Sequence, residues 1–193
     1  MRGAVVGVTE QGNALVLVTI SSVGVLLDRR RVVLTHGLPT HPHHHEGSWA
    51  VGRYLSAPGA RSLPIQEAIA LVARVRAASE AAAREAFAAL TASVDAPIDT
   101  IAIRAWPPMQ DATEARIRDH RAQTMADSVM YRESAIVAAE SRGWAVMWYD
   151  AARVVDEAPA VALAAMRRAA GAPWQAAHRQ AAAAALMAIR TRA

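Results

Sequence analysis

Histidine is concentrated in one short segment, and its spacing there could support metal chemistry. Five of the seven histidines lie between Thr35 and Gly47, and Glu46 follows the last of them. Imidazole and carboxylate groups suit Zn, Ni, Mn or Fe, and alternate residues of an extended chain point the same way. The segment predicts a divalent transition metal, Mn or Zn, with the ligands His41, His43, His45 and Glu46. The spacing matches no defined zinc motif, and a polar loop with local hydrogen bonds explains the same residues.

Arginine supplies all the positive charge, because the chain contains no lysine among its 21 basic residues. Guanidinium groups match phosphate geometry, and a net charge of +4 favours an anionic partner. Two groups are candidates for nucleic-acid binding: Arg29, Arg30 and Arg31, and Arg116, Arg118 and Arg121. The bias of a GC-rich genome toward Ala and Arg explains the same composition.

Asp119 and His120 adjoin the second arginine group, where His120 could act as a general base beside phosphate-binding cations. A solvated helix face accounts for the same pair. We retain both interpretations.

The size and composition favour a single domain over residues 1–193, with a histidine-rich loop at 36–60. The absence of cysteine excludes disulfides and thiolate zinc sites, and it predicts a cytoplasmic protein. No apolar run approaches the ~20 residues that a bilayer requires, and the N-terminus lacks the pattern of a signal peptide. We therefore expect no membrane association.

The spacing of apolar residues and the position of turn-forming residues predict the strands and helices that must position these side chains. Strands are expected at 3–9, 14–27 and 31–34, with a break at Asp28, Arg29 and Arg30, although Gly24 could instead split the long second strand. Helical periodicity covers 62–94, 111–142, 160–170 and 174–189. Further strands are expected at 98–106 and 144–149. The order requires an antiparallel unit joined to parallel crossovers.

This order is that of the ribonuclease H-like fold, and the chain resembles RuvC-type junction resolvases in its pattern of elements. The similar runs are residues 128–133 continuing through 138–146, and the final helical segment 173–182. The resemblance implies an α/β fold with a mixed five-stranded sheet, in which three antiparallel N-terminal strands precede two strands with crossover helices.

In that family, carboxylates on the first strand, at the end of the fourth strand and on the last helix bind two divalent ions. The matching places here hold Thr9, Arg104 and His178, and Glu10 is the only acid near the first. Hard divalent ions need carboxylate oxygens, so matching positions cannot assemble the two-metal site. The candidate catalytic residues are Glu10, His120 and His178. In an enzyme of this kind, the histidine segment is expected to carry the metal.

The sequence therefore predicts a nucleic-acid-binding or nucleic-acid-processing protein. If it is an enzyme, we expect a metal-dependent nuclease whose active site differs from that of the family. The alternative is a catalytically inactive structural or assembly subunit, which forms homo-oligomers. It rests on the alanine-rich last helix, because small residues let a partner helix approach closely.

Overall fold

The computed structural model describes residues 3–43 and 63–192. An antiparallel unit opens the chain, formed by β1 (Ala4–Gln11), β2 (Ala14–Ile20) and β3 (Leu26–Val33). Gly12 allows the tight turn between β1 and β2, because its φ of 60° lies in the left-handed region. These three strands confirm the predicted antiparallel unit.

The predicted break at Asp28, Arg29 and Arg30 is wrong, because all three residues lie within β3. The chain turns earlier, between β2 and β3, where Gly24 has a φ of 83°, which confirms the alternative that Gly24 splits the long second strand. Charged residues are tolerated in β3 because it is an edge strand of the sheet. Arg30 also binds the Asp28 carboxylate through two hydrogen bonds of 2.7 and 2.6 Å.

Two parallel strands complete the sheet. β4 (Ile98–Arg104) pairs with β1, and β5 (Ala145–Tyr149) pairs with β4, so the strand order is β3-β2-β1-β4-β5. This confirms the mixed five-stranded α/β sheet that the sequence predicted. Since β1 and β4 run in the same direction, their carboxyl ends meet at one edge of the sheet.

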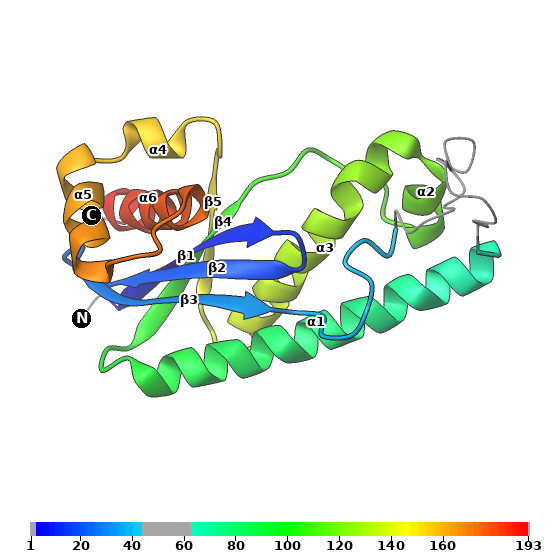
Figure 1. The fold of residues 1–193 in the computed structure, drawn as a ribbon, viewed down its shortest axis with the longest axis horizontal. Coiled ribbons are helices and arrows are strands. Elements are labelled where there is room, and N and C mark those ends of the chain that lie inside the picture. Colours follow the sequence, from blue (N-terminus) through cyan, green and yellow to red (C-terminus); the bar gives the residue numbers. More distant parts are fainter. Residues whose placement is uncertain (1–2, 44–62, 193) are drawn as a thin grey trace.

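Helices cover both faces of the sheet (Figure 1). On one face lie α1 (Ile65–Ser93), α2 (Thr113–Arg118) and α3 (His120–Glu140). On the other lie α4 (Val154–Glu157), α5 (Ala160–Ala170) and α6 (Ala176–Thr191). The sequence predicted a continuous helix over 111–142, but Asp119 divides it. Its carboxylate accepts hydrogen bonds from the backbone N–H groups of Arg121 and Ala122, so it caps α3.

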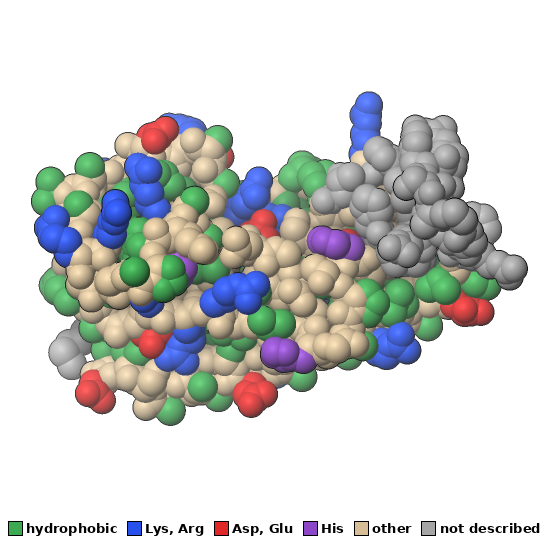
Figure 2. Space-filling model, viewed as in Figure 1, with side chains coloured by type: hydrophobic (Ala, Val, Ile, Leu, Met, Phe, Trp, Pro, Cys, Tyr) green, Lys and Arg blue, Asp and Glu red, His purple; other side chains and the backbone are tan. Residues whose placement is uncertain are grey.

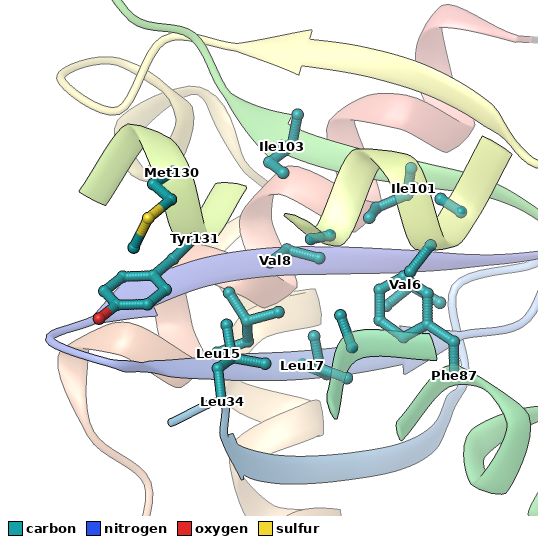
Figure 3. Close-up of a cluster of buried hydrophobic side chains, with 14 of the residues drawn as sticks. Val6, Val8, Leu15, Leu17, Leu34, Phe87, Ile101, Ile103, Met130 and Tyr131 are labelled. Carbon is teal, nitrogen blue, oxygen red and sulfur yellow. The ribbon is translucent and has the colours of Figure 1, made fainter. Parts of the chain in front are cut away.

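The sheet separates two apolar cores. On the α1 and α3 side, Val6, Val8 and Leu17 pack against Phe87 and Tyr131 (Figure 3). The opposite core has a different character, since a row of alanines from α6 lies against the sheet. Its members include Ala181, Ala182, Ala183, Ala184, Ala185 and Ala188.

Gly7 permits the close approach of α6 to β1. A Cβ atom at this position would lie 1.8 Å from the carbonyl oxygen of Ala181, so only glycine fits under the helix backbone. Small residues on both sides of this contact therefore set the depth at which α6 sits.

Asp99 joins the two ends of the described chain. Its carboxylate accepts a hydrogen bond of 2.7 Å from the backbone N–H of Gly3 and another of 2.7 Å from Arg192. Burial acts to raise the pKa of Asp99, but hydrogen bonds from Arg192, Gly3 and Thr100 outweigh it, and the pKa is lowered. Both ends consequently lie on the same side of the molecule (Figure 1).

None of the helices in these described ranges is long and apolar enough to cross a membrane.

Candidate nucleic-acid interface

At the carboxyl end of β1, Thr9 faces the same side of the sheet as α6 and is nearly buried. Its hydroxyl lies 3.2 Å from the phenol oxygen of Tyr149, which also donates a hydrogen bond of 2.8 Å to the carbonyl of Val8. Burial raises the pKa of Tyr149 to about 12, so the phenol stays neutral at physiological pH. The place where the resemblance implies a carboxylate therefore holds a neutral pair of hydroxyls.

Glu10, the next residue, is engaged by two arginines. Its Oε1 atom lies 3.6 Å from Nε of Arg132 and 3.4 Å from Nη1 of Arg104. Only 7% of the Glu10 side chain is exposed, and its Oε2 atom is buried with no hydrogen-bond partner in the described part of the chain. Glu10 thus acts as an internal counter-ion, because both charges beside it are positive.

Arg132 comes from α3 and is almost fully buried. It donates hydrogen bonds to the carbonyls of Ser128, Arg104 and Ala105, and so attaches the end of β4 to α3. Burial lowers the pKa of this guanidinium, and the charge of Glu10 acts in the opposite direction. Its geometry is that of a structural cation.

Arg104 is different, because 48% of its side chain is exposed. It ends β4, where the family resemblance implies a metal-binding acid. Next to it, Trp106 packs edge-to-face against Trp148 at 5.0 Å, and Arg132 lies over the Trp106 ring. Half of the Trp148 side chain is exposed. Cationic and aromatic groups therefore share this edge of the sheet.

At the start of α6, His178 has a structural role. Its Nδ1 atom accepts a hydrogen bond of 3.2 Å from the backbone N–H of Gln175, which closes a capping box, and its ring stacks on Trp174. Burial lowers the pKa of His178, and the charge of Arg29 lowers it further. One turn further along α6, Ala181 lies directly on Gly7.

These residues do not fit a pair of hard divalent ions. Thr9, Arg104 and Ala181 offer no carboxylate, Glu10 is neutralised by arginines, and the accessible charge is positive. Mg²⁺ in proteins keeps several waters and is held by one or two carboxylates together with substrate phosphates, and the carboxylate of Glu10 is already paired with arginines. No step of two-metal hydrolysis can therefore be derived from this edge.

The histidine segment contacts α3 through Asp127, a residue that the sequence analysis did not single out. The Nδ1 atom of His43 lies 2.7 Å from Oδ1 of Asp127, and the His43 backbone N–H donates to the same oxygen. Nδ1 of His41 lies 3.5 Å from the other carboxylate oxygen. His43 is fully buried, and its Nε2 atom has no hydrogen-bond partner among the residues that the structure describes.

The rest of the predicted metal site is not described, because His45 and Glu46 lie outside the described residues. Within 3–43 and 63–192, no three His, Asp or Glu residues are arranged to hold a metal ion. The backbone of His120 begins α3, and its side chain also lies outside what the structure describes. The metal prediction therefore stays a prediction.

The six predicted nucleic-acid-binding arginines differ in how far they are engaged. Arg29 donates to the carbonyls of Ala172 and Pro173, and Arg30 binds Asp28 and Ser93. Arg116 forms a partly buried ion pair with Glu133, in which Nη1 lies 3.5 Å from Oε1. Arg118 pairs with Glu114 but remains about half exposed, and Arg31 and Arg121 are exposed.

A surface groove of about 460 Å³ lies where the chain continues beyond β4. Met109, Asp119, Arg121 and Met125 contribute to its lining. Its lining runs from Pro108 to Arg121, which belongs to one of the predicted basic groups. Asp127, Arg132 and Trp148 were not among the predicted site residues, because each acts through partners far away in the sequence, where no local pattern signals the contact.

No family model matches the chain, and no curated protein matches its sequence. Among solved structures, it is similar to T. thermophilus RuvC in complex with a Holliday junction substrate, with a TM-score of 0.54 and 15% identity over 99% of this chain and 96% of that one. The chain has the RuvC-type ribonuclease H-like fold. A second structure, Thermus thermophilus RuvC, matches with a TM-score of 0.46 and 17% identity over 98% of this chain and 95% of the other. The RuvC-type fold confirms the architecture expected from the order of elements.

Proposed function

We propose that this chain binds nucleic acid at the carboxyl ends of β1 and β4 and does not cleave it by two-metal hydrolysis. The observation that carries the proposal is the replacement of acidic groups at this edge. Thr9 and Tyr149 form a neutral pair, Arg104 is exposed, and Glu10 is a buried counter-ion.

The fold and the charge distribution support a nucleic-acid partner. The RuvC structure with the same fold was solved with a Holliday junction substrate, and we extend this binding class to the present chain. Figure 2 shows basic side chains spread over the half of this face that carries α4, α5 and α6. Arg31, Arg104 and Arg121 are exposed and can contact phosphates.

The test uses fluorescence polarisation with a labelled four-way junction, a duplex and a single strand of the same length. We expect binding at low salt that weakens linearly with salt on a logarithmic scale, because phosphate contacts release counterions. Incubation of the junction with Mg²⁺ or Mn²⁺ should leave it uncut. Absence of binding to all three probes, or divalent-dependent cleavage, would contradict the proposal.

The assembly-subunit alternative loses its main support in the structure. The alanines of α6, which suggested a surface for a partner helix, are buried within the same chain, where α6 packs on the sheet, α4 and α5. The homo-oligomer and the cytoplasmic setting stay predictions. A mass measurement in solution, giving a monomer at micromolar concentration, would exclude the homo-oligomer.

We also propose a transition-metal site, Mn or Zn, in the histidine segment. Metal-binding histidines typically donate the second ring N–H to a carboxylate. His43 has this arrangement, since Nδ1 contacts Asp127 and the buried Nε2 has no partner within 3–43 and 63–192. Elemental analysis of untagged protein should find metal that the His43→Ala, His45→Ala double variant and the His45→Ala single variant both lose. His36→Ala is the control and should retain it. A metal content equal in all four proteins would exclude the site.

A further inference from the structure

The end of β4 carries a positive charge that no described acid fully compensates. Glu10 is the acid nearest to Arg104, but its Oε1 atom also lies beside Arg132. Two guanidinium groups thus share one carboxylate. Since Arg132 is almost fully buried, the excess charge reaches solvent through Arg104, whose side chain is 48% exposed.

The position of this charge is informative. RuvC-type resemblance implies that a carboxylate at the end of the fourth strand holds a divalent ion, and the ion in turn attracts the phosphodiester. Here a guanidinium stands at that strand end, with the neutral Thr9 and Tyr149 hydroxyls beside it. A guanidinium binds phosphate oxygens directly, through two parallel N–H donors.

We infer that Arg104 takes the place of the divalent ion and binds a backbone phosphate of the nucleic acid directly. Binding at this edge is then independent of divalent metal. The inference rests on the proposed function and deepens it, because it names the group that contacts the ligand and the ion that the contact replaces.

The neighbouring side chains favour this role for Arg104 over a structural one. Among the described residues, its guanidinium makes one long contact, of 3.4 Å, with Glu10, whereas Arg132 makes hydrogen bonds to several carbonyls. The carbonyl of Arg104 accepts one of those hydrogen bonds, so the backbone at this point is fixed while the side chain remains accessible. A fixed backbone under an exposed guanidinium lowers the entropy cost of holding a phosphate.

The experiment measures affinity for the labelled four-way junction by polarisation, in EDTA and in Mg²⁺, over a range of salt concentrations. Wild-type protein should bind in EDTA, and Mg²⁺ should not strengthen the binding, because it competes as a counterion for the same phosphates. Arg104→Gln should weaken binding by about tenfold at low salt and reduce the logarithmic salt slope by about 1. Arg104→Lys keeps the charge and should keep the slope.

Arg84→Gln is the matched control, because Arg84 is equally exposed and pairs with Glu80 on α1. It should bind as wild type does. Circular dichroism melts confirm that each variant is folded. Wild-type binding that requires Mg²⁺, or an Arg104→Gln slope equal to that of Arg84→Gln, would overturn the inference while leaving the proposed function in place. Absence of wild-type binding in either buffer would overturn both.

Discussion

At the residue scale, the ion pair of Glu10 with Arg132 is the most informative feature of the candidate interface. Both side chains are nearly buried, with exposed fractions of 7% and 4%. A buried pair of charges contributes little net stability, because desolvation offsets attraction, but removal of one partner leaves an uncompensated charge. Glu10 is therefore held as a structural acid.

Arg132→Met tests this role. The substitution removes the buried cation and leaves the Glu10 carboxylate with only the long contact to Arg104. We expect a loss on the order of 3 kcal/mol in the free energy of unfolding, measured by urea denaturation. The double variant Glu10→Gln, Arg132→Met should recover part of that loss. A single variant as stable as wild type would show that Glu10 does not depend on Arg132.

His178 predicts a pH dependence of stability. Because burial and Arg29 lower its folded pKa, the folded protein favours the neutral ring, and the unfolded chain binds a proton first as the pH falls. The stabilisation that the neutral His178 ring contributes to the folded protein is therefore present above about pH 6.5. It is lost as the pH falls through the pKa of His178 in the folded protein, which is the lower of the two.

The measurement is the urea midpoint of wild type and of His178→Gln at pH 7.5 and pH 5.5. Glutamine keeps an acceptor for the capping box but does not titrate. The wild-type midpoint should fall more than that of the variant, and the other histidines contribute equally to both. Parallel changes in the two proteins would remove His178 as a source of the pH dependence.

At the element scale, the contact of α6 with β1 determines how closely the second helical layer approaches the sheet. Gly7→Ala would place a methyl group against the Ala181 backbone. The backbone of a helix cannot move aside as a flexible side chain does. We therefore expect the free energy of unfolding to fall by about 3 kcal/mol.

Gly37→Ala is the comparison for this prediction. Gly37 has a φ of 70°, and an added methyl group would meet nothing within 4 Å, so its cost is conformational only, at about 1 kcal/mol. Chemical denaturation of both variants separates the two causes. Equal losses would show that Gly7 is not required for steric reasons.

The helices and strands were predictable where apolar residues repeat with helical or strand spacing over many residues, or where turn-forming residues mark an end. The 29-residue helix α1 and the strand β4 follow from such patterns. The break within 14–33 was misplaced because a run of charged residues resembles a turn, although an edge strand accepts them. The division between α2 and α3 was missed because Asp119 acts through backbone hydrogen bonds that require the helix to exist first. Among the candidate residues, Glu10 and His178 were identified by type and position, but their partners were not, since Arg132 and Arg29 are distant in sequence.

At the scale of the whole molecule, the sheet separates two layers with different packing. Bulky side chains fill the core beneath α1 and α3, and alanines fill the core beneath α6. Glu10, Arg104 and the Thr9–Tyr149 pair lie at the edge where β1 and β4 end. The remote end of the sheet instead holds the contacts of Asp99.

The position of Asp99 has a practical consequence for attachment of the protein to a surface. Because this carboxylate binds both Gly3 and Arg192, a label placed near either residue sits beside the start of β4. Arg104 lies at the far end of the same strand, about 16 Å away for five residues of extended chain. Protein immobilised through a tether beside Gly3 or beside Arg192 should therefore present the same edge to a nucleic acid in solution, with equal binding in both orientations.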